Sequence, residues 1–224
     1  MQRKIKFLIV IALISLNIKC QNKKDKADKE MSTNDSVIDI LSIDFESDLD
    51  KVISLTNFNL GESEYSEYLQ AYSSVSMEKF KLGAIQFNSN FKVNGIDIPN
   101  DSYISFSFSK KEINQIKAVH IRYNFIEDDI LNLFQKEFGK PDLLGQAGSI
   151  NDFKGSKNYI WKDVNANHSI IVSQNSDGSA LSTGNGVSQK VNSVLIYIVG
   201  NASINYPNGQ TETVLQRLID RFSY

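Results

Sequence analysis

The feature that most constrains this chain is a pattern of alternating apolar and polar residues in short segments joined by brief polar turns. Residues 103–108 alternate in this way, and so do residues 119–123. A polar turn at about 110–114 separates them. Alternation with a period of two is typical of β-strands, and short connections favour antiparallel pairing over crossover units. The pattern predicts antiparallel sheets.

Further segments are also expected to be strands. Residues 91–93 and 96–98 flank Asn94-Gly95, a pair that favours the tight type I′ turn of a hairpin. We also expect strands at 159–161, 169–173 and 194–199.

The strongest helix signal covers residues 127–138. Asn124 and Glu127 form a capping-box pattern, and Gly139 with Pro141 provides a stop. The apolar stripe consists of Ile130, Leu131, Phe134 and Phe138. Asp128 and Asp129 fall in the first turn, where acids favour the helix dipole, and they do not form an acid/base pair.

Three other segments show helical spacing. One begins near Ser47, with Leu49, Val52 and Ile53 on one side. Another closes the chain, with Thr211 as its expected cap and Glu212 in its first turn. Residues 63–72 space their tyrosines helically, although a strand is an open alternative there.

These elements predict an α+β fold, with antiparallel sheets and helices packed on one face. Because each half begins with a helix and continues with strands, residues 37–224 can be read as two tandem units, about 37–124 and 125–224. The run Phe138-Gly139-Lys140-Pro141-Asp142, followed by Tyr159-Ile160-Trp161, resembles β-lactamase inhibitor protein-like domains, in which a helix ends in Gly-x-Pro and enters an antiparallel sheet. The resemblance implies a binding module and transfers no functional residues.

The first twenty residues have the pattern of an export signal. Arg3, Lys4 and Lys6 precede an apolar run from Phe7 to Leu16, which is shorter than the roughly 20 residues that a membrane-spanning helix needs. Cys20, the only cysteine, follows, and residues 21–36 are hydrophilic. This arrangement resembles bacterial lipoprotein signal peptides, in which the cysteine becomes the acylated N-terminus.

The resemblance implies a signal peptide at 1–19, a disordered lipidated tether at 20–36 and anchoring of the protein in the cell envelope, by acyl chains such as palmitate, to the outer membrane or the periplasmic face. It departs from the usual pattern at Asn17 and Lys19. An ordinary signal-peptidase site and an uncleaved anchor stay open as alternatives.

Charge and cysteine content restrict the partners. Removing the four basic residues of 1–19 leaves 20 Lys and Arg against 26 Asp and Glu, a net charge of -6. An acidic domain repels phosphate backbones, so nucleic acid is not an expected partner. A single cysteine excludes an intrachain disulfide.

No catalytic set stands out. His120 lies in an alternating run, where the expected position is the polar face of a strand, and His168 lies at a turn; both are read as solvated or structural. Asp163, Asn165 and Asn167 match the first ligand positions of a calcium loop, but His168 replaces the required Gly and Gln174 the final Glu, so a hairpin turn explains them better. We expect neither a metal nor a cofactor.

Two further features have structural explanations. Residues 176–186 are rich in Gly and Ser and predict a mobile loop, which a partner could contact. Trp161, with Tyr159 on the same strand face, is expected to pack against the 127–138 helix.

Three functions remain open. The favoured hypothesis is a non-enzymatic, membrane-anchored binding module for an envelope protein or a small ligand. The alternatives are a carboxylate-dependent hydrolase acting on an envelope glycan, whose paired acids would be invisible in sequence, and a structural or assembly lipoprotein.

Overall fold

The computed structural model describes residues 37–63, 68–93, 96–99, 101–125, 130–146, 157–165, 167–174, 179–183, 187–200 and 202–223. The leader, Cys20 and the tether at 20–36 lie outside the described residues. Residues 37–224 form one compact unit.

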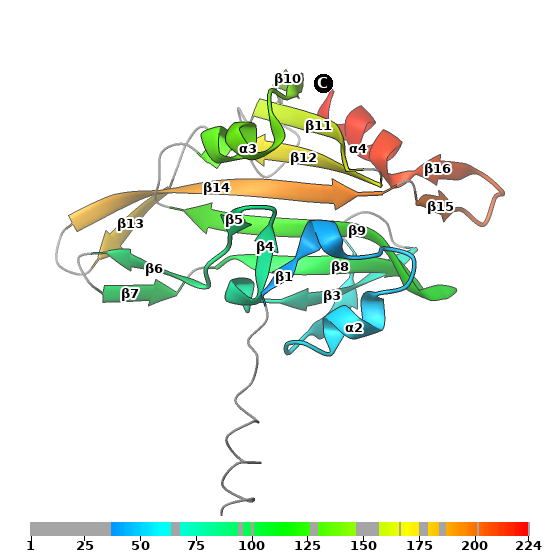
Figure 1. The fold of residues 1–224 in the computed structure, drawn as a ribbon, viewed down its shortest axis with the longest axis horizontal. Helices are drawn as coiled ribbons and strands as arrows, with labels where there is room; N and C mark the ends of the chain where they lie inside the picture. The colour runs from blue at the N-terminus through cyan, green and yellow to red at the C-terminus, as the bar shows by residue number, and fades with distance from the viewer. Residues whose placement is uncertain are drawn as a thin grey trace, which may run out of the picture. The chain divides into compact units, whose positions relative to one another are not determined.

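A nine-stranded antiparallel sheet dominates this unit (Figure 1). Its main path has the order β10-β11-β12-β14-β9-β8-β3-β2, and β13 pairs with β14. The strands are β2 (Asn59–Glu62), β3 (Leu69–Ser74), β8 (Tyr103–Ser109), β9 (Glu112–Phe125), β10 (Asp142–Gln146), β11 (Lys157–Asn165), β12 (His168–Gln174), β13 (Ser179–Thr183) and β14 (Val187–Val199).

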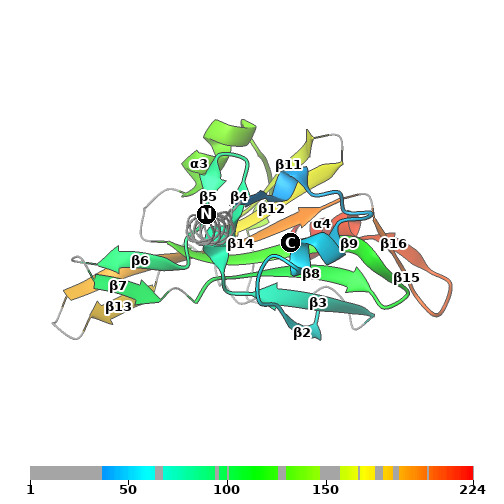
Figure 2. The ribbon, with the colours of Figure 1, turned by 60° about the horizontal axis from the view of Figure 1, so that its bottom comes forward.

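Smaller elements surround this sheet. The remaining strands are β1 (Ile38–Asp39), β4 (Phe80–Leu82), β5 (Ile85–Gln86), β6 (Asn90–Val93), β7 (Ile96–Pro99), β15 (Ser203–Asn205) and β16 (Thr211–Thr213). The helices are α2 (Leu49–Ile53), α3 (Ile130–Phe138) and α4 (Val214–Phe222), with 3-10 turns η1 (Ile40–Ser42) and η2 (Met77–Lys79). Hairpins β6–β7 and β15–β16 lie at opposite ends of the long strands in both views (Figures 1 and 2).

Strand β14 shows how the core is built. Val194, Ile196 and Ile198 enter one hydrophobic cluster, which also receives α2 and α3. The alternate residues Leu195, Tyr197 and Val199 enter a second cluster, which receives Val214, Leu218 and Phe222 of α4. Because side chains of a strand alternate between faces, the sheet is covered on both sides.

The predicted α+β layout with helices on one face is therefore wrong: the fold is mainly β. Strands from both halves of the chain join one sheet, since β9 pairs with β14 along residues 118–125 and 192–199. The helices are short and pack on opposite faces of that sheet, α2 and α3 on one face and α4 on the other. Local periodicity indicates many of the single elements but does not show that distant strands pair with one another.

The predicted strands are confirmed, and most are longer than expected. β8 and β9 form a hairpin whose turn is only Lys110 and Lys111, so β9 begins at Glu112. β6 and β7 pair as the predicted hairpin. Asn94 and Gly95 themselves lie outside the described residues.

The strong helix signal is confirmed from Ile130 to Phe138, while Glu127, Asp128 and Asp129 lie outside the described residues. Gly139 adopts a left-handed φ of 80°, as expected for the residue that ends a helix. Its carbonyl accepts a hydrogen bond of 2.8 Å from Trp161 Nε1.

Trp161 also packs against α3 as predicted. Its ring lies 5.6 Å from that of Phe134, and Tyr159 borders the same core cluster. The helix near Ser47 is confirmed as α2, with Leu49 and Val52 buried.

Two local predictions are wrong, and the structure decides one alternative that the sequence left open. The cap of α4 is Thr213, whose hydroxyl accepts from the Gln216 amide at 3.1 Å, whereas Thr211 belongs to β16. For residues 63–72 the sequence left a helix and a strand open; residues 69–72 belong to the strand β3, because Leu69 and Tyr72 face opposite core clusters, while residues 64–67 lie outside the described part. Residues 179–183 of the expected loop at 176–186 form β13.

None of the helices in the described part of the chain is both long enough and apolar enough to cross a membrane.

Candidate functional site

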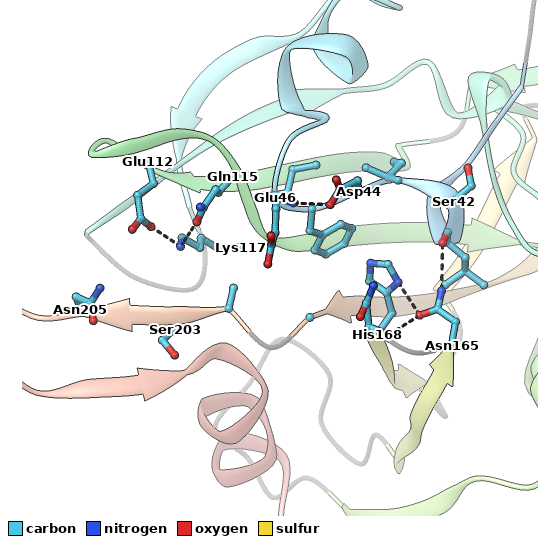
Figure 3. Close-up of a pocket in the computed structure, with 17 residues that line it drawn as sticks. Ser42, Asp44, Glu46, Glu112, Gln115, Lys117, Asn165, His168, Ser203 and Asn205 are labelled. Carbon is cyan, nitrogen blue, oxygen red and sulfur yellow. Dashed lines mark hydrogen bonds and ion pairs between the residues drawn. The ribbon is translucent and has the colours of Figure 1, made fainter.

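A polar hollow of about 830 Å³ lies beside the first residues of β9 (Figure 3). Four segments line it: residues 41–46, the start of β9, the β11–β12 turn, and residues 200–205. These segments come from distant parts of the sequence, so the hollow exists only in the folded unit.

Lys117 is the most unusual residue of the hollow. Only 6% of its side chain is exposed. Its Nζ pairs with the Glu112 carboxylate and donates to Gln115 Oε1 at 3.0 Å (Figure 3). An ammonium group has three donors, and the third has no partner within the described residues. Burying such a charge costs several kcal/mol unless it is well paired.

The wall formed by residues 41–46 is fixed to the sheet at two points. The Ile116 amide donates to the Phe45 carbonyl at 2.6 Å, beside Lys117. The Asn165 side-chain amide donates to the Leu41 carbonyl at 3.1 Å. The hollow is therefore held between β9 and the β11–β12 hairpin.

Asp44 shapes the turn that carries this wall. It accepts from the Glu46 amide at 3.0 Å and from the Ser47 hydroxyl at 2.6 Å. These bonds, the Ser47 hydroxyl first and the Glu46 amide second, lower the pKa of the Asp44 carboxyl. Asp44 therefore stays ionised at neutral pH.

His168 forms part of the opposite wall, at the first position of β12. It is buried, its ring lies edge-on to Phe45 at 4.4 Å, and its Nδ1 lies 2.9 Å from Asn165 Oδ1. Burial lowers its pKa, although the nearby Asp44 charge opposes the shift. The ring is consequently neutral at pH 7, as a structural histidine would be.

The segment that resembles a calcium loop is the hairpin turn between β11 and β12, as predicted. Asn165 Oδ1 accepts from the Asn167 amide at 3.0 Å as well as contacting His168. Asp163 has a left-handed φ of 51°, and its amide donates to the Ser169 hydroxyl at 3.2 Å. Within the described ranges, no three His, Cys, Asp or Glu side chains gather closely enough to hold a metal ion.

Several polar side chains of the hollow have no internal partner. Within the described part of the chain, the carboxylate of Glu46, the amide group of Asn167 and the hydroxyl of Ser203 make no hydrogen bond or ion pair, and all three residues line the hollow. In the view of Figure 3, the Glu46 carboxylate lies between Lys117 and His168. These groups are open to hydrogen bonds from a ligand.

A second hollow of about 410 Å³ continues from the first. Both are lined by Glu112, Lys117, Ser203 and Asn205. The second hollow adds Lys110 and Lys111 from the β8–β9 turn, and Tyr68 with Tyr206, whose rings meet edge to face at 5.5 Å.

Tyr206 is held by two charged side chains. Its hydroxyl donates to Glu212 at 2.9 Å and accepts from Arg217. Burial, followed by the hydrogen bond to Glu212, raises the pKa of Tyr206. The phenol therefore stays protonated near neutral pH and presents a fixed ring to the second hollow.

The expected position of His120 on the polar face of a strand is wrong, and of the two readings, solvated or structural, its burial fits only the structural one. It is 1% exposed, and its ring stacks on Tyr197 at 4.8 Å. Tyr197 in turn contacts Phe222 of α4 at 5.3 Å, so the face expected to be polar is covered. His120 lines neither hollow.

Sequence reasoning missed Lys117, although a signal was present. Lys117 interrupts the run Ile116-Lys117-Ala118-Val119, which is otherwise apolar. Lysine is almost never fully buried unless it is paired, so a lysine in a strand of this kind indicates a site. Comparison of the chain with protein-family models, with curated proteins and with solved structures found no match.

Proposed function

We propose that this chain is an envelope lipoprotein, anchored through Cys20, whose folded unit binds a small polar ligand in the hollow around Lys117. The leader and the hydrophilic segment after Cys20 support the anchor. The hollow supports the binding role. The resemblance to β-lactamase inhibitor protein-like binding domains stays a prediction.

The buried ammonium of Lys117 is the observation that carries the binding role. A lysine serving only the fold could be replaced by an apolar residue without loss, because buried ion pairs rarely add net stability. Here the charge lines two hollows and retains a donor without a partner within the described residues. Preformed sites commonly combine a concave surface with a few fixed polar groups.

The hydrolase alternative has less support from the geometry. A glycan-cleaving pair needs one carboxyl with a raised pKa to act as the acid. The three carboxylates that line the first hollow, those of Asp44, Glu46 and Glu112, are exposed, and the pKa of Asp44 is lowered. We therefore favour binding over hydrolysis.

A thermal-stability screen tests the binding role. The full chain in detergent is mixed with amino acids, di- and tripeptides, sugars, sugar phosphates and nucleosides. A true ligand at ten times its Kd should raise Tm by about 3–6 °C. The rise should be lost in Lys117→Met and kept in Lys81→Met, a matched lysine that pairs with Asp39 outside both hollows.

Two results would contradict the binding role: no compound raises Tm, or the rise is the same in Lys117→Met. Recovery of a stable envelope complex without any small ligand would instead favour the structural or assembly role.

Metabolic labelling tests the anchor. In a bacterial host, the chain should incorporate an azide-tagged palmitate, and mass spectrometry should find an acylated N-terminal peptide that begins at Cys20. Cys20→Ala should abolish the label. Retention of Met1, or cleavage with an unmodified Cys20, would remove the lipid anchor from the proposal.

A further inference from the structure

The two hollows carry opposite charges. The first is lined by the carboxylates of Asp44, Glu46 and Glu112 against the single ammonium of Lys117. The second is lined by Lys110, Lys111 and Lys117 against the single carboxylate of Glu112. The Lys117–Glu112 pair belongs to both and marks the boundary between an acidic end and a basic end.

The end charges are not neutralised by neighbours. Within the described residues, Glu46, Lys110 and Lys111 make no ion pair, and all three are exposed. Like-charged groups that remain unpaired around a hollow attract a ligand group of the opposite sign. The acidic end therefore suits a cation, and the basic end suits an anion.

The surface between the ends is polar in its centre and partly apolar at the basic end. Ser203 and Asn205 line both hollows, and their side chains can hydrogen-bond amide groups. Leu69, Tyr206 and Pro207 add apolar surface beside the lysines. A ligand that fits this order has an amino group, then amide groups, then an apolar side chain near a carboxylate.

We propose that the two hollows together bind a short peptide with free termini, its ammonium in the acidic hollow and its carboxylate in the basic hollow. This inference rests on the proposed binding function and names its ligand class. A single amino acid carries its ammonium and its carboxylate on the same carbon atom, whereas a peptide carries them at opposite ends of its chain, as two adjoining hollows of opposite charge favour. Capture of chain termini by fixed charges and amides is a known recognition mode.

Calorimetric titration of the full chain in detergent with alanyl-alanyl-tyrosine tests the proposal at low salt, where exposed charges are least screened. The free peptide should bind. N-acetylation, which removes the ammonium, and C-terminal amidation, which removes the carboxylate, should each weaken binding by about three- to fivefold, as expected for exposed charge pairs.

Variants assign each terminus to its hollow. In Glu46→Gln, acetylation should no longer weaken binding, while amidation still should. In the double variant Lys110→Gln, Lys111→Gln, the pattern should reverse. The matched controls Glu62→Gln and Lys157→Gln alter exposed residues outside both hollows and should behave as the unmodified chain does.

Equal affinity for the free and blocked peptides would overturn the proposal, as would variants that change both blocked peptides alike or a free peptide that does not bind at millimolar concentration. If another compound of the screen still stabilises the chain in a Lys117-dependent manner, the binding function stands and only the peptide class is wrong. If no compound stabilises the chain in this manner, both the binding function and the peptide class are contradicted.

Discussion

At the scale of single residues, two buried side chains of the first hollow, those of Lys117 and His168, have the clearest consequences for stability. Both lie in walls of the first hollow, yet they differ in charge. Lys117 is paired with Glu112, whose side chain is 42% exposed, whereas the pKa of His168 is lowered by burial. Solvent therefore keeps Glu112 hydrated if its partner is removed, but Lys117, whose side chain is only 6% exposed, has far less access to solvent.

This asymmetry predicts unequal effects on stability. Glu112→Gln leaves the Lys117 charge buried without its carboxylate and should lower the free energy of unfolding by about 1–3 kcal/mol. Lys117→Met, which removes the charge and keeps the length, should cost less. Urea denaturation measures both. Equal stability of Glu112→Gln and the unmodified chain would show that the ammonium is solvated.

His168 predicts a pH dependence of stability. Its pKa is lower in the folded chain than the ordinary value of 6.5, so the unfolded chain binds its proton more readily. The contribution of neutral His168 is therefore fully present above about pH 6.5 and is lost as pH falls through the folded-state pKa.

Denaturation between about pH 8 and pH 5 should accordingly show a larger loss of stability in the unmodified chain than in His168→Phe, which keeps the ring against Phe45 but cannot titrate. Identical pH profiles would show that His168 does not contribute.

Among these single residues, some structural roles follow from the local sequence and others do not. The turn role of Asn165 follows from its own spacing, because its side chain bonds to residues two and three positions away. The burial of His120 and Lys117 does not follow in this way. It depends on α4 and on residues 41–46, which fold against β9 from distant parts of the chain.

At the scale of elements, the long strands β8, β9, β11, β12 and β14 and the α3 helix could be predicted because each carries a clear local signal, whereas β13 was expected to be a loop. Residues 130–138 have an apolar stripe, a following glycine and a proline. The local sequence does not decide which residue caps α4, because Thr211 and Thr213 are chemically equal candidates two residues apart. Pairing of Thr211 with Asn205 in the β15–β16 hairpin decides between them.

The position of the cap gives a prediction with a built-in control. Thr213→Ala removes the acceptor for the Gln216 amide and should destabilise the chain by about 0.5–2 kcal/mol. Thr211→Ala removes an exposed hydroxyl bond to Asn205 and should change stability by less than about 0.5 kcal/mol. Thermal unfolding compares them. A larger loss of stability in Thr211→Ala than in Thr213→Ala would show that Thr211 caps the helix, as the sequence predicts.

At the scale of the whole described unit, the decisive feature is the sheet that is covered on both faces. The apolar run Val194–Val199 reads as a strand in sequence, but its lack of alternation is what a strand buried on both sides requires. The α+β expectation recognised that the chain contains both helices and strands. It did not foresee that strands from both halves join one sheet and that the fold is therefore mainly β. The hollow depends on that sheet, because β14 pairs with both β9 and β12 and so brings them close together. Residues of β15, which belongs to the separate β15–β16 hairpin, complete the lining.

Hydrogen exchange with mass spectrometry tests the central claim, that ligand binds at the hollow around Lys117, most directly. The full chain is compared with and without the compound of the thermal screen that raises Tm most. Amides of residues 41–46 and 112–117 should exchange more slowly with the compound present, and Lys117→Met should lose this protection. Protection confined to a distant element such as the β6–β7 hairpin would contradict the account.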